Sequence, residues 1–512
     1  MPGMDQVTAV IDWIANNFLW AILAWVLLAA GIFFCIRTGA VQFRFFGQMF
    51  RAVTEKTDRT ETAPEGDRDS EARRRRFSGR GGLSSFKSFT ISAASRVGTG
   101  NIAGVALAIS VGGPGTIFWM WVIAIVGGAT AFVESTLGQL YKSKSGGEYH
   151  GGPAFYMSRG LRLGWLSPVF VVAIVLTYGF VYEAIQTNSI VEAVSYSIGR
   201  DTVEVRIIIG LVIALMTSVV IFGGLRRIAN VTQVIVPFMA AIYIAIGILV
   251  VVANIDKVPD MFATIVGSAL GFKEIAGASI WLAFTNGMQR GLFSNEAGQG
   301  SVPNAAATAT VSHPAKQGLV QTLGVYFDTL LVCSITAFII LLSGAPVVGE
   351  PETSTLTQSA LAATTGEWGA HAITVILFFL AFSSVLGNFY LAQANLEYFT
   401  ESHRIHTFFR GFVVVAVFLG ALGSIPLVWA LGDMFAATMV FINLVAIVPL
   451  AGVAVRLLKN YRAQKKAGLD PVFHRSMMPD LKGIECWDGT DEATFDGEER
   501  ARVMRERGIE LA

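Results

Sequence analysis

Long apolar stretches separated by short polar ones dominate this chain of 512 residues. A helix that rises 1.5 Å per residue needs roughly 20 mostly apolar residues to cross about 30 Å of hydrocarbon. The stretches that meet this requirement are 13–35, 84–112, 115–141, 167–194, 204–223, 229–254, 276–302, 315–343, 368–396, 406–423 and 427–458. The pattern therefore predicts an all-α integral membrane protein with about 11 transmembrane helices.

Two of these stretches, 84–112 and 276–302, are interrupted by glycine and polar residues. Each of them opens a group of five predicted spans, over residues 84–254 and 276–458. Because five is an odd number, the second group begins on the opposite side of the membrane, and the two halves have inverted topology. Paired interrupted helices that open inverted halves are typical of secondary transporters with a site near the middle of the membrane. Residues 1–36 add one extra N-terminal transmembrane helix.

Composition and charge agree with this class and orient the chain. Of the residues, 53% are hydrophobic and 15% are charged, and the mean hydropathy of +0.57 is far above that of a soluble domain. Loops on one predicted side hold 20 Lys and Arg before the tail is counted, and loops on the other side hold 3. Because cytoplasmic loops carry the excess of positive charge, we expect a cell-membrane protein with its N-terminus outside and a cytoplasmic tail over residues 459–512.

The loop over residues 37–83 is then cytoplasmic. It is polar, basic and short of apolar residues, so we expect it to be partly disordered. Its run Arg73–Arg76 is expected chiefly to fix the topology, and binding of anionic lipid is the alternative.

Other features narrow the function by exclusion. The cysteines Cys35, Cys333 and Cys486 are far apart and form no metal-binding spacing. No HExxH or GxSxG motif occurs, and the 6 histidines are scattered, so we expect no enzyme and no cofactor. A channel would use symmetric repeats from several chains, whereas two inverted halves in one chain favour a carrier. The net charge of +1 gives no indication of a nucleic-acid partner.

The first interruption, residues 95–104, has the composition of an unwound helix. Gly98 and Gly100 allow unwinding and a close approach of a ligand to the backbone. The half-helix that starts near Asn101 offers free N–H groups and its positive dipole end to a carboxylate. The preceding half-helix ends in free carbonyls, which suit an ammonium group or Na⁺. A zwitterionic amino acid with a sodium ion satisfies both ends, although the glycines alone fit a simple kink equally well.

The second interruption, residues 284–300, is too polar to face lipid. A polar lining for a ligand cavity explains it better, and a loop that begins near Arg290 is the alternative. Several further charges fall within predicted spans, and we expect most of them to form structural pairs inside the bundle. They are Glu134, Glu183, Glu192, Arg290, Glu296 and Asp328.

Three blocks carry a resemblance to a known family. They are VGTGNIAGVALAISVGGPGTIFWMW (97–121), GQLYKSKSGGEYHGGPAFYM (138–157) and GLFSNEAGQGSVPNAAATA (291–309). These blocks are highly specific and closely resemble the alanine/glycine:cation symporters, and the similarity runs from about residue 84 to residue 458. The resemblance implies the LeuT fold, which has two inverted five-helix repeats, here preceded by one extra N-terminal transmembrane helix.

The resemblance also implies a substrate site made by both interruptions and by the third core helix, which lines the pocket in LeuT-fold proteins. Its residues are Gly98, Thr99, Gly100, Asn101, Gln186, Thr285, Asn286 and Gly287. The VGTGN segment is similar to the unwound first core helix of the bacterial leucine transporter, so its backbone amides would hold the substrate carboxylate. For Gln186, a hydrogen bond between helices is a nearly equal alternative.

A sodium site follows from the same resemblance. Carbonyl oxygens of the first interrupted helix and adjacent hydroxyls of the eighth core helix would hold the ion. These residues are Ala94, Val97, Ser383 and Ser384. Serine pairs in membrane helices commonly bond back to their own backbone, which is the alternative. The leucine transporter has a small residue where this chain has Arg96, and a guanidinium there would oppose a second sodium ion, so we expect one.

The expected function is a sodium-coupled symporter that imports alanine or glycine across the lipid bilayer by alternating access. Serine or glutamine remains an alternative substrate. A proton remains an alternative coupling ion, because Ser383 and Ser384 do not titrate but Glu134 or Glu183 can.

Overall fold

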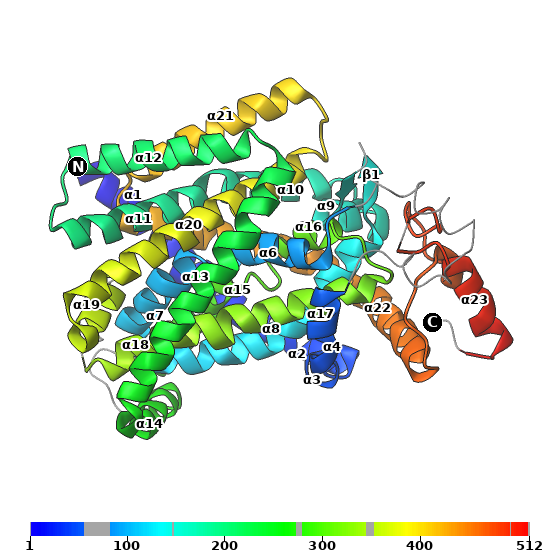
Figure 1. Ribbon diagram of the computed structural model, residues 1–512, viewed down its shortest axis with the longest axis horizontal. Helices are drawn as coiled ribbons and strands as arrows, with labels where there is room; N and C mark the ends of the chain where they lie inside the picture. The colour runs from blue at the N-terminus through cyan, green and yellow to red at the C-terminus, as the bar shows by residue number, and fades with distance from the viewer. Residues whose placement is uncertain are drawn as a thin grey trace, which may run out of the picture.

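The computed structural model describes residues 2–55, 82–145, 148–272, 279–344, 353–491 and 493–509, with side chains from residue 6 onward. Most of its long helices run side by side along the longest axis of the molecule (Figure 1). Most of the predicted basic loop, with its run Arg73–Arg76, lies outside the described residues.

The chain is built almost entirely from helices, several of which contain π-helical turns. The first half holds α1 (Pro2–Trp13), η1 (Ile14–Leu19), α2 (Trp20–Thr38), α3 (Val41–Arg44), α4 (Phe46–Thr54), α6 (Ser85–Arg96), η3 (Gly100–Gly104), α7 (Val105–Gly112), α8 (Gly115–Leu140), the antiparallel strands β1 (Ser143–Ser145) and β2 (Glu148–His150), α9 (Pro153–Phe155), η4 (Tyr156–Gly160), α10 (Leu166–Leu176), η5 (Thr177–Val181), α11 (Tyr182–Ile198), α12 (Val203–Ile221) and α13 (Leu225–Ala253). The second half holds η6 (Ile255–Lys257), α14 (Val258–Ala269), α15 (Ile280–Asn295), α16 (Val302–Ala307), α17 (Pro314–Val325), η7 (Tyr326–Cys333), α18 (Ser334–Leu342), α19 (Ser354–Thr365), α20 (Glu367–Leu396), α21 (His403–Gly420), α22 (Ile425–Lys466), η8 (Arg475–Met477) and α23 (Gly497–Glu506).

Among the described residues, 8 helical segments are long and apolar enough to cross a membrane. They are Gln6–Thr38, Gly115–Leu140, Leu166–Ile198, Val203–Ile221, Leu225–Ala253, Pro314–Leu342, Glu367–Leu396 and Ile425–Lys466. Three of the predicted spans are absent from this set. The two interrupted ones are broken into shorter helices, and the third, 406–423, corresponds to α21. The exact total of about 11 spans stays a prediction, as do the boundaries of the two predicted repeats.

The spanning segments divide into inner and outer helices. In the most apolar window of α20, 78% of the residues are buried, and in the segment from α17 to α18 the share is 72%. In α13 the share is only 28%, and α12 and α21 lie together along one side of the molecule (Figure 1). The inner helices α6, α8, α17 and α20 therefore form the core, and α6 is the helix that carries the first interruption.

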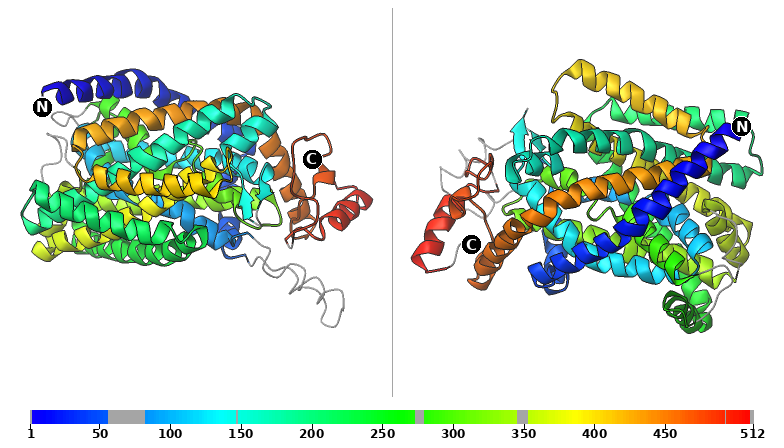
Figure 2. Two further views of the ribbon diagram at one scale, coloured as in Figure 1. Left: turned by 90° about the horizontal axis from the view of Figure 1, so that it is seen from above. Right: turned by 180° about the vertical axis from the view of Figure 1, so that it is seen from behind.

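The N-terminal helix and the C-terminal segment both pack on this core. The continuous segment from α1 to α2 crosses the outside of α22 (Figure 2). Beyond α22, the side chain of Trp487 is buried and donates to the carbonyl oxygen of Gln139 at 3.2 Å. The amide of Phe473 donates to the carbonyl oxygen of Ser312 at 2.8 Å. The C-terminal segment thus covers one end of the helix bundle, which we call the tail end.

Candidate functional site

The first interruption lies directly after α6. The backbone leaves the helical region at Val97 (φ −84°, ψ 89°), and helical geometry resumes at Thr99. The amide of Gly98 donates to Oδ1 of Asn101 at 2.8 Å, and the amide of Thr99 donates to Oε1 of Gln186 at 3.1 Å. The first N–H groups of a helix have no partner within the helix. At the interruption, backbone N–H groups therefore donate hydrogen bonds to neutral side-chain amides.

The carbonyl side of the same interruption faces α20. Oγ of Ser384 donates to the carbonyl oxygen of Ala94 at 2.7 Å, whereas Ser383 donates to a carbonyl of its own helix at 2.7 Å. A Cβ atom on Gly98 would lie 2.0 Å from Oγ of Ser384 and 3.1 Å from Oε1 of Gln186. Only glycine fits this gap, so three helices bring their oxygen atoms together at one point of the buried core.

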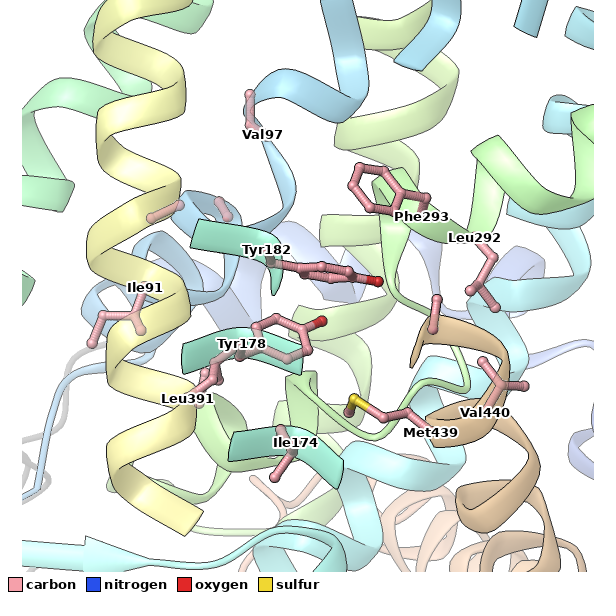
Figure 3. Packing of buried hydrophobic residues seen from close by; sticks show 14 of the residues in the cluster. Ile91, Val97, Ile174, Tyr178, Tyr182, Leu292, Phe293, Leu391, Met439 and Val440 are labelled. Carbon is pink, nitrogen blue, oxygen red and sulfur yellow. The ribbon is translucent and has the colours of Figure 1, made fainter. Parts of the chain in front are cut away.

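Aromatic side chains form the walls beside this point. A Cβ atom on Gly100 would lie 3.1 Å from the ring of Phe293. That ring lies 5.0 Å from the ring of Tyr182 and 5.2 Å from the ring of Trp429. Figure 3 shows Phe293 and Tyr182 close to each other beside the turn that carries Val97. The interruption is therefore closely packed against aromatic rings on this side.

The sequence pattern did not identify these aromatic residues as part of the site. Tyr182 lies one helical turn before Gln186 and so shares its face, which was the available signal. Phe293 and Trp429 come from helices far away in the sequence, and nothing in their spacing indicates that they meet.

A buried carboxyl group anchors the interruption from the other side. Oδ1 of Asp328 accepts a bond from Nδ2 of Asn101 at 2.7 Å. Its Oδ2 accepts bonds from Oγ of Ser294 at 2.7 Å and from Oγ1 of Thr329 at 2.7 Å. Asn101 thus links the unwound backbone at Gly98 to α15 and to η7. The sequence indicated Asp328 only as one of several intramembrane charges.

The remaining predicted substrate contacts lie elsewhere. Thr285 donates to the carbonyl oxygen of Trp281 at 2.9 Å, and Asn286 donates to a carbonyl of the preceding turn at 3.0 Å. A Cβ atom on Gly287 would meet the backbone of α8 at 2.6 Å. At 1.5 Å per residue, these positions lie about 10 Å along α15 from Phe293. The structure therefore does not bring Thr285, Asn286 and Gly287 to the unwound segment.

The second interruption begins later than the sequence predicted. The helix α15 is continuous through residues 285–295 and ends at Glu296, which has a left-handed backbone with φ of 58°. Gly298 (φ 91°) and Gly300 (φ 82°) follow before α16 begins. Polar side chains bond back to their own helix at 285 and 286, so polarity there does not mark a break. The alternative of a loop near Arg290 is also wrong, because Arg290 lies within α15.

Carboxyl groups hold the second interruption. Oε1 of Glu134 accepts a bond from the amide of Gly298 at 3.0 Å, and its Oε2 accepts one from Nδ2 of Asn443 at 2.9 Å. Glu296 accepts bonds from Ser95 and from Ser301, each at 2.6 Å. Ser95 belongs to α6, so Glu296 ties the second interruption directly to the helix that carries the first one.

Two buried arginines flank the site. Nη1 of Arg96 donates to the carbonyl oxygen of Gln321 at 3.3 Å, on the side of α17. Arg290 forms a buried ion pair with Asp433 and also lies over the ring of Trp429, 4.9 Å from its centroid. The sequence did not indicate Asp433 as a partner, because it lies 143 residues further along the chain.

Comparison with known proteins identifies relatives along nearly the whole chain. The sequence pattern of the sodium:alanine symporter family matches residues 4–475. Amino-acid carrier protein AlsT of Bacillus subtilis is 47% identical over 93% of this chain and 97% of its own length. The probable sodium/glutamine symporter GlnT of the same organism is 41% identical over 96% and 98%. The sodium/alanine symporter AgcS of Methanococcus maripaludis is 36% identical over 88% and 96%.

The fold also matches a solved structure. MhsT in complex with L-phenylalanine superposes with a TM-score of 0.51, over 75% of this chain and 90% of MhsT, at 15% identity. At this identity the similarity shows the fold alone. The predicted LeuT fold is thereby confirmed, and the family and the relatives confirm a membrane transporter rather than an enzyme.

Proposed function

Because the chain belongs to the sodium:alanine symporter family, we propose that it is a sodium-coupled symporter that imports alanine or glycine. The observation that carries this proposal is the first interruption. There, backbone N–H donors and oxygen acceptors lie within one turn of each other. A zwitterion needs donors for its carboxylate and acceptors for its ammonium group, and Na⁺ needs oxygen atoms. The interruption offers each of these within the buried core.

The substrate carboxylate binds the amides of Gly98, Thr99 and Gly100 in this proposal. Two of these amides are satisfied by side-chain oxygens of Asn101 and Gln186. A carboxylate is a stronger acceptor than a neutral amide, so it can replace them. The oxygen of Gln186 that is released can then accept a bond from the substrate ammonium group.

The sodium ion binds where α6 meets α20. Its ligands are the carbonyl oxygens of Ala94 and Val97 and the hydroxyl oxygens of Ser383 and Ser384. The contact between Ser384 and Ala94 supports this set, because it brings two oxygen atoms to 2.7 Å. Hard cations take such oxygen ligands at about 2.3–2.6 Å, so the hydroxyl only has to turn its proton away. We retain one sodium ion per substrate as the expectation.

The close packing of aromatic rings beside Gly100 favours a small side chain on the substrate. Phe293 lies against Gly100, and Tyr182 and Trp429 contact Phe293. A methyl group or a hydrogen atom fits beside them more easily than a long amide. Glutamine stays the alternative substrate, because GlnT is 41% identical to this chain. A proton stays the alternative coupling ion.

Coupling follows from the shared position of the two ligands. Sodium that holds Ala94 and Val97 orders the end of α6 and so pre-forms the amides that bind the substrate. Thermodynamic reciprocity requires that the substrate also raise the affinity for sodium. Alternating access then exposes the site to each side in turn, with the N-terminus outside and the tail end in the cytoplasm.

Uptake of radiolabelled alanine into proteoliposomes tests this function. We expect uptake under an inward sodium gradient and none when potassium replaces sodium. The double variant Ser383→Ala/Ser384→Ala should lose sodium-driven uptake. Its matched control is Ser359→Ala, since Ser359 also donates to a carbonyl one turn earlier but lies in α19. Equal uptake in potassium would refute sodium coupling, and full activity of the double variant would refute the ion site.

Competition decides between the substrates. An excess of unlabelled alanine or glycine should abolish the uptake of labelled alanine, whereas glutamine should compete weakly. Stronger competition by glutamine than by alanine would refute alanine as the preferred substrate and favour glutamine.

A further inference from the structure

The short helices α3 and α4 lie at the end of a membrane-spanning segment. The span Gln6–Thr38 is followed by Gly39 and Ala40, which both have left-handed backbones with φ of 63° and 56°. This turn sets α4 across the direction of α8 and α17 (Figure 1). Because α2 crosses the hydrocarbon, a helix that turns sideways directly after it lies at the boundary between hydrocarbon and headgroups.

One face of α4 packs on the core of the protein. Met49, Ala52 and Val53 are buried, and Ala52 and Val53 cluster with Val320 of α17. Phe89 of α6 packs against the same cluster. This inner face accounts for one apolar stripe of the helix, and it connects α4 with two helices of the core.

The adjacent face is also apolar, and the side chains of the described residues leave it exposed. Phe43 is 62% exposed, Phe46 is 48% exposed and Phe50 is 51% exposed. The rings of Phe46 and Phe50 lie 5.4 Å apart in an edge-to-face arrangement. Large exposed aromatic rings on α3 and α4 are typical of helices that rest in the membrane interface.

Arginines flank these phenylalanines in the sequence. Arg37, Arg44 and Arg51 are exposed, and none of them forms an ion pair among the described residues. The sequence contains no acidic residue from Trp13 to Thr54, so the segment carries a clear positive charge. Exposed phenyl rings between arginines match the chemistry of a phospholipid layer with anionic headgroups, in which the rings enter the acyl region and the guanidinium groups meet phosphate.

We propose that α3 and α4 bind anionic phospholipid in the leaflet at the tail end of the molecule. The rings of Phe43, Phe46 and Phe50 anchor the helix, and Arg37, Arg44 and Arg51 select the anionic headgroup. The packing of the inner face of α4 on Val320 and Phe89 then connects the lipid site to α17 and to α6, the helix that carries the first interruption. This binding does not depend on which amino acid or ion the protein carries.

The test measures lipid binding by the purified full-length protein. Short-chain phosphatidylglycerol, short-chain phosphatidylcholine and free glycerol 1-phosphate are titrated in detergent, and the thermal unfolding midpoint is followed. Native mass spectrometry counts the retained lipids. We expect only phosphatidylglycerol to raise the midpoint and to be retained. Equal effects of both lipids would overturn the selection of anionic headgroups, and an equal effect of glycerol 1-phosphate would show a free-phosphate site instead.

Charge variants locate the site. The triple variant Arg37→Gln/Arg44→Gln/Arg51→Gln should lower the affinity for phosphatidylglycerol on the order of a hundredfold, at about fivefold for each arginine. The matched control is Arg226→Gln/Arg227→Gln, which removes two exposed arginines at the start of α13, about one turn before Asn230, the residue that accepts a hydrogen bond from Lys87 of α6. An unchanged affinity of the triple variant, or an equal loss in the control, would overturn the proposal. Because lipid binding is read without transport, this failure is distinguishable from a failure of the proposed function.

Discussion

The two helix interruptions both contain glycines but use them differently: Gly98 leaves room for the close approach of Ser384, whereas Gly298 and Gly300 adopt positive φ angles. They also differ in what holds their backbone. At the first, the side-chain amide oxygens of Asn101 and Gln186 accept hydrogen bonds from backbone N–H groups. At the second, the carboxyl group of Glu134 accepts the amide of Gly298, and Glu296 accepts bonds from two serines. Unwinding a helix in a membrane leaves donors that must be satisfied. At the second interruption a carboxyl group meets part of this need, beside the neutral amide oxygen of Asn295, which accepts a hydrogen bond from the amide of Ala297 at 3.0 Å.

We infer from this difference that the first interruption binds the substrate and that the second has a structural role. Hydrogen bonds to carboxylates are roughly twice as strong as bonds between neutral groups. Neutral amides can therefore give way to an incoming carboxylate, whereas at the second interruption the amide of Gly298 is already bound to a carboxyl group. We infer that the first interruption exchanges ligands during transport and that the second one holds its shape.

Gly98→Ala should have the largest effect and should reduce alanine uptake more than a hundredfold. The new Cβ atom would lie 2.0 Å from Oγ of Ser384, so the contact between α6 and α20 must open. Gly411→Ala is the control, because a Cβ atom there meets nothing within 4 Å. Uptake assays with both variants at equal protein level test this, and near-normal uptake by Gly98→Ala would remove the first interruption from the mechanism.

Glu134→Gln should lower the free energy of unfolding by about 1–3 kcal/mol. The two oxygens of Glu134 accept hydrogen bonds from Gly298 and Asn443, whereas the glutamine amide has only one oxygen that can accept. Thermal unfolding in the absence of substrate measures this effect. Glu367→Gln, at an exposed helix start, should change little. Should Glu134→Gln instead keep its stability and raise the half-saturating alanine concentration, the second interruption would itself be a binding device.

Ser384→Ala should raise the half-saturating sodium concentration about tenfold, which corresponds to about 1.4 kcal/mol. Ser384 bridges to Ala94 across the helix interface, whereas Ser383 bonds within its own helix. We therefore expect a smaller change for Ser383→Ala, measured by sodium titration of uptake. A larger effect at Ser383 would reverse the assignment of the principal hydroxyl ligand.

Gln186→Met should raise the half-saturating alanine concentration several-fold, because it removes the oxygen that lies against Thr99 and Gly98 while keeping similar bulk. Sodium affinity, measured without substrate, should change less. If neither quantity moves and only thermal stability falls, Gln186 serves as a hydrogen bond between helices, which was the alternative from the sequence.

The sequence predicted the fold class and the first interruption because their signals are local. Glycines beside hydroxyl and amide residues at 98–101 mark one break, and the apolar lengths mark the spans. The side chains that hold the second interruption could not be predicted from the sequence, because Glu134 and Asn443 are 309 residues apart and meet only through the fold. The position of the second break was misjudged because polar residues in a helix satisfy themselves when they bond to the preceding turn.

This error yields the prediction with the smallest effect. Thr285 and Asn286 bond to carbonyls of the preceding turn and lie away from the unwound segment. Thr285→Val and Asn286→Ala should therefore change the half-saturating alanine concentration less than twofold, and their uptake curves should overlay that of the unchanged protein. A tenfold rise in either variant would mean that α15 unwinds near residue 285 in another state of the transport cycle. The second interruption would then extend during transport, and the contrast between an exchanging break and a fixed one would no longer hold.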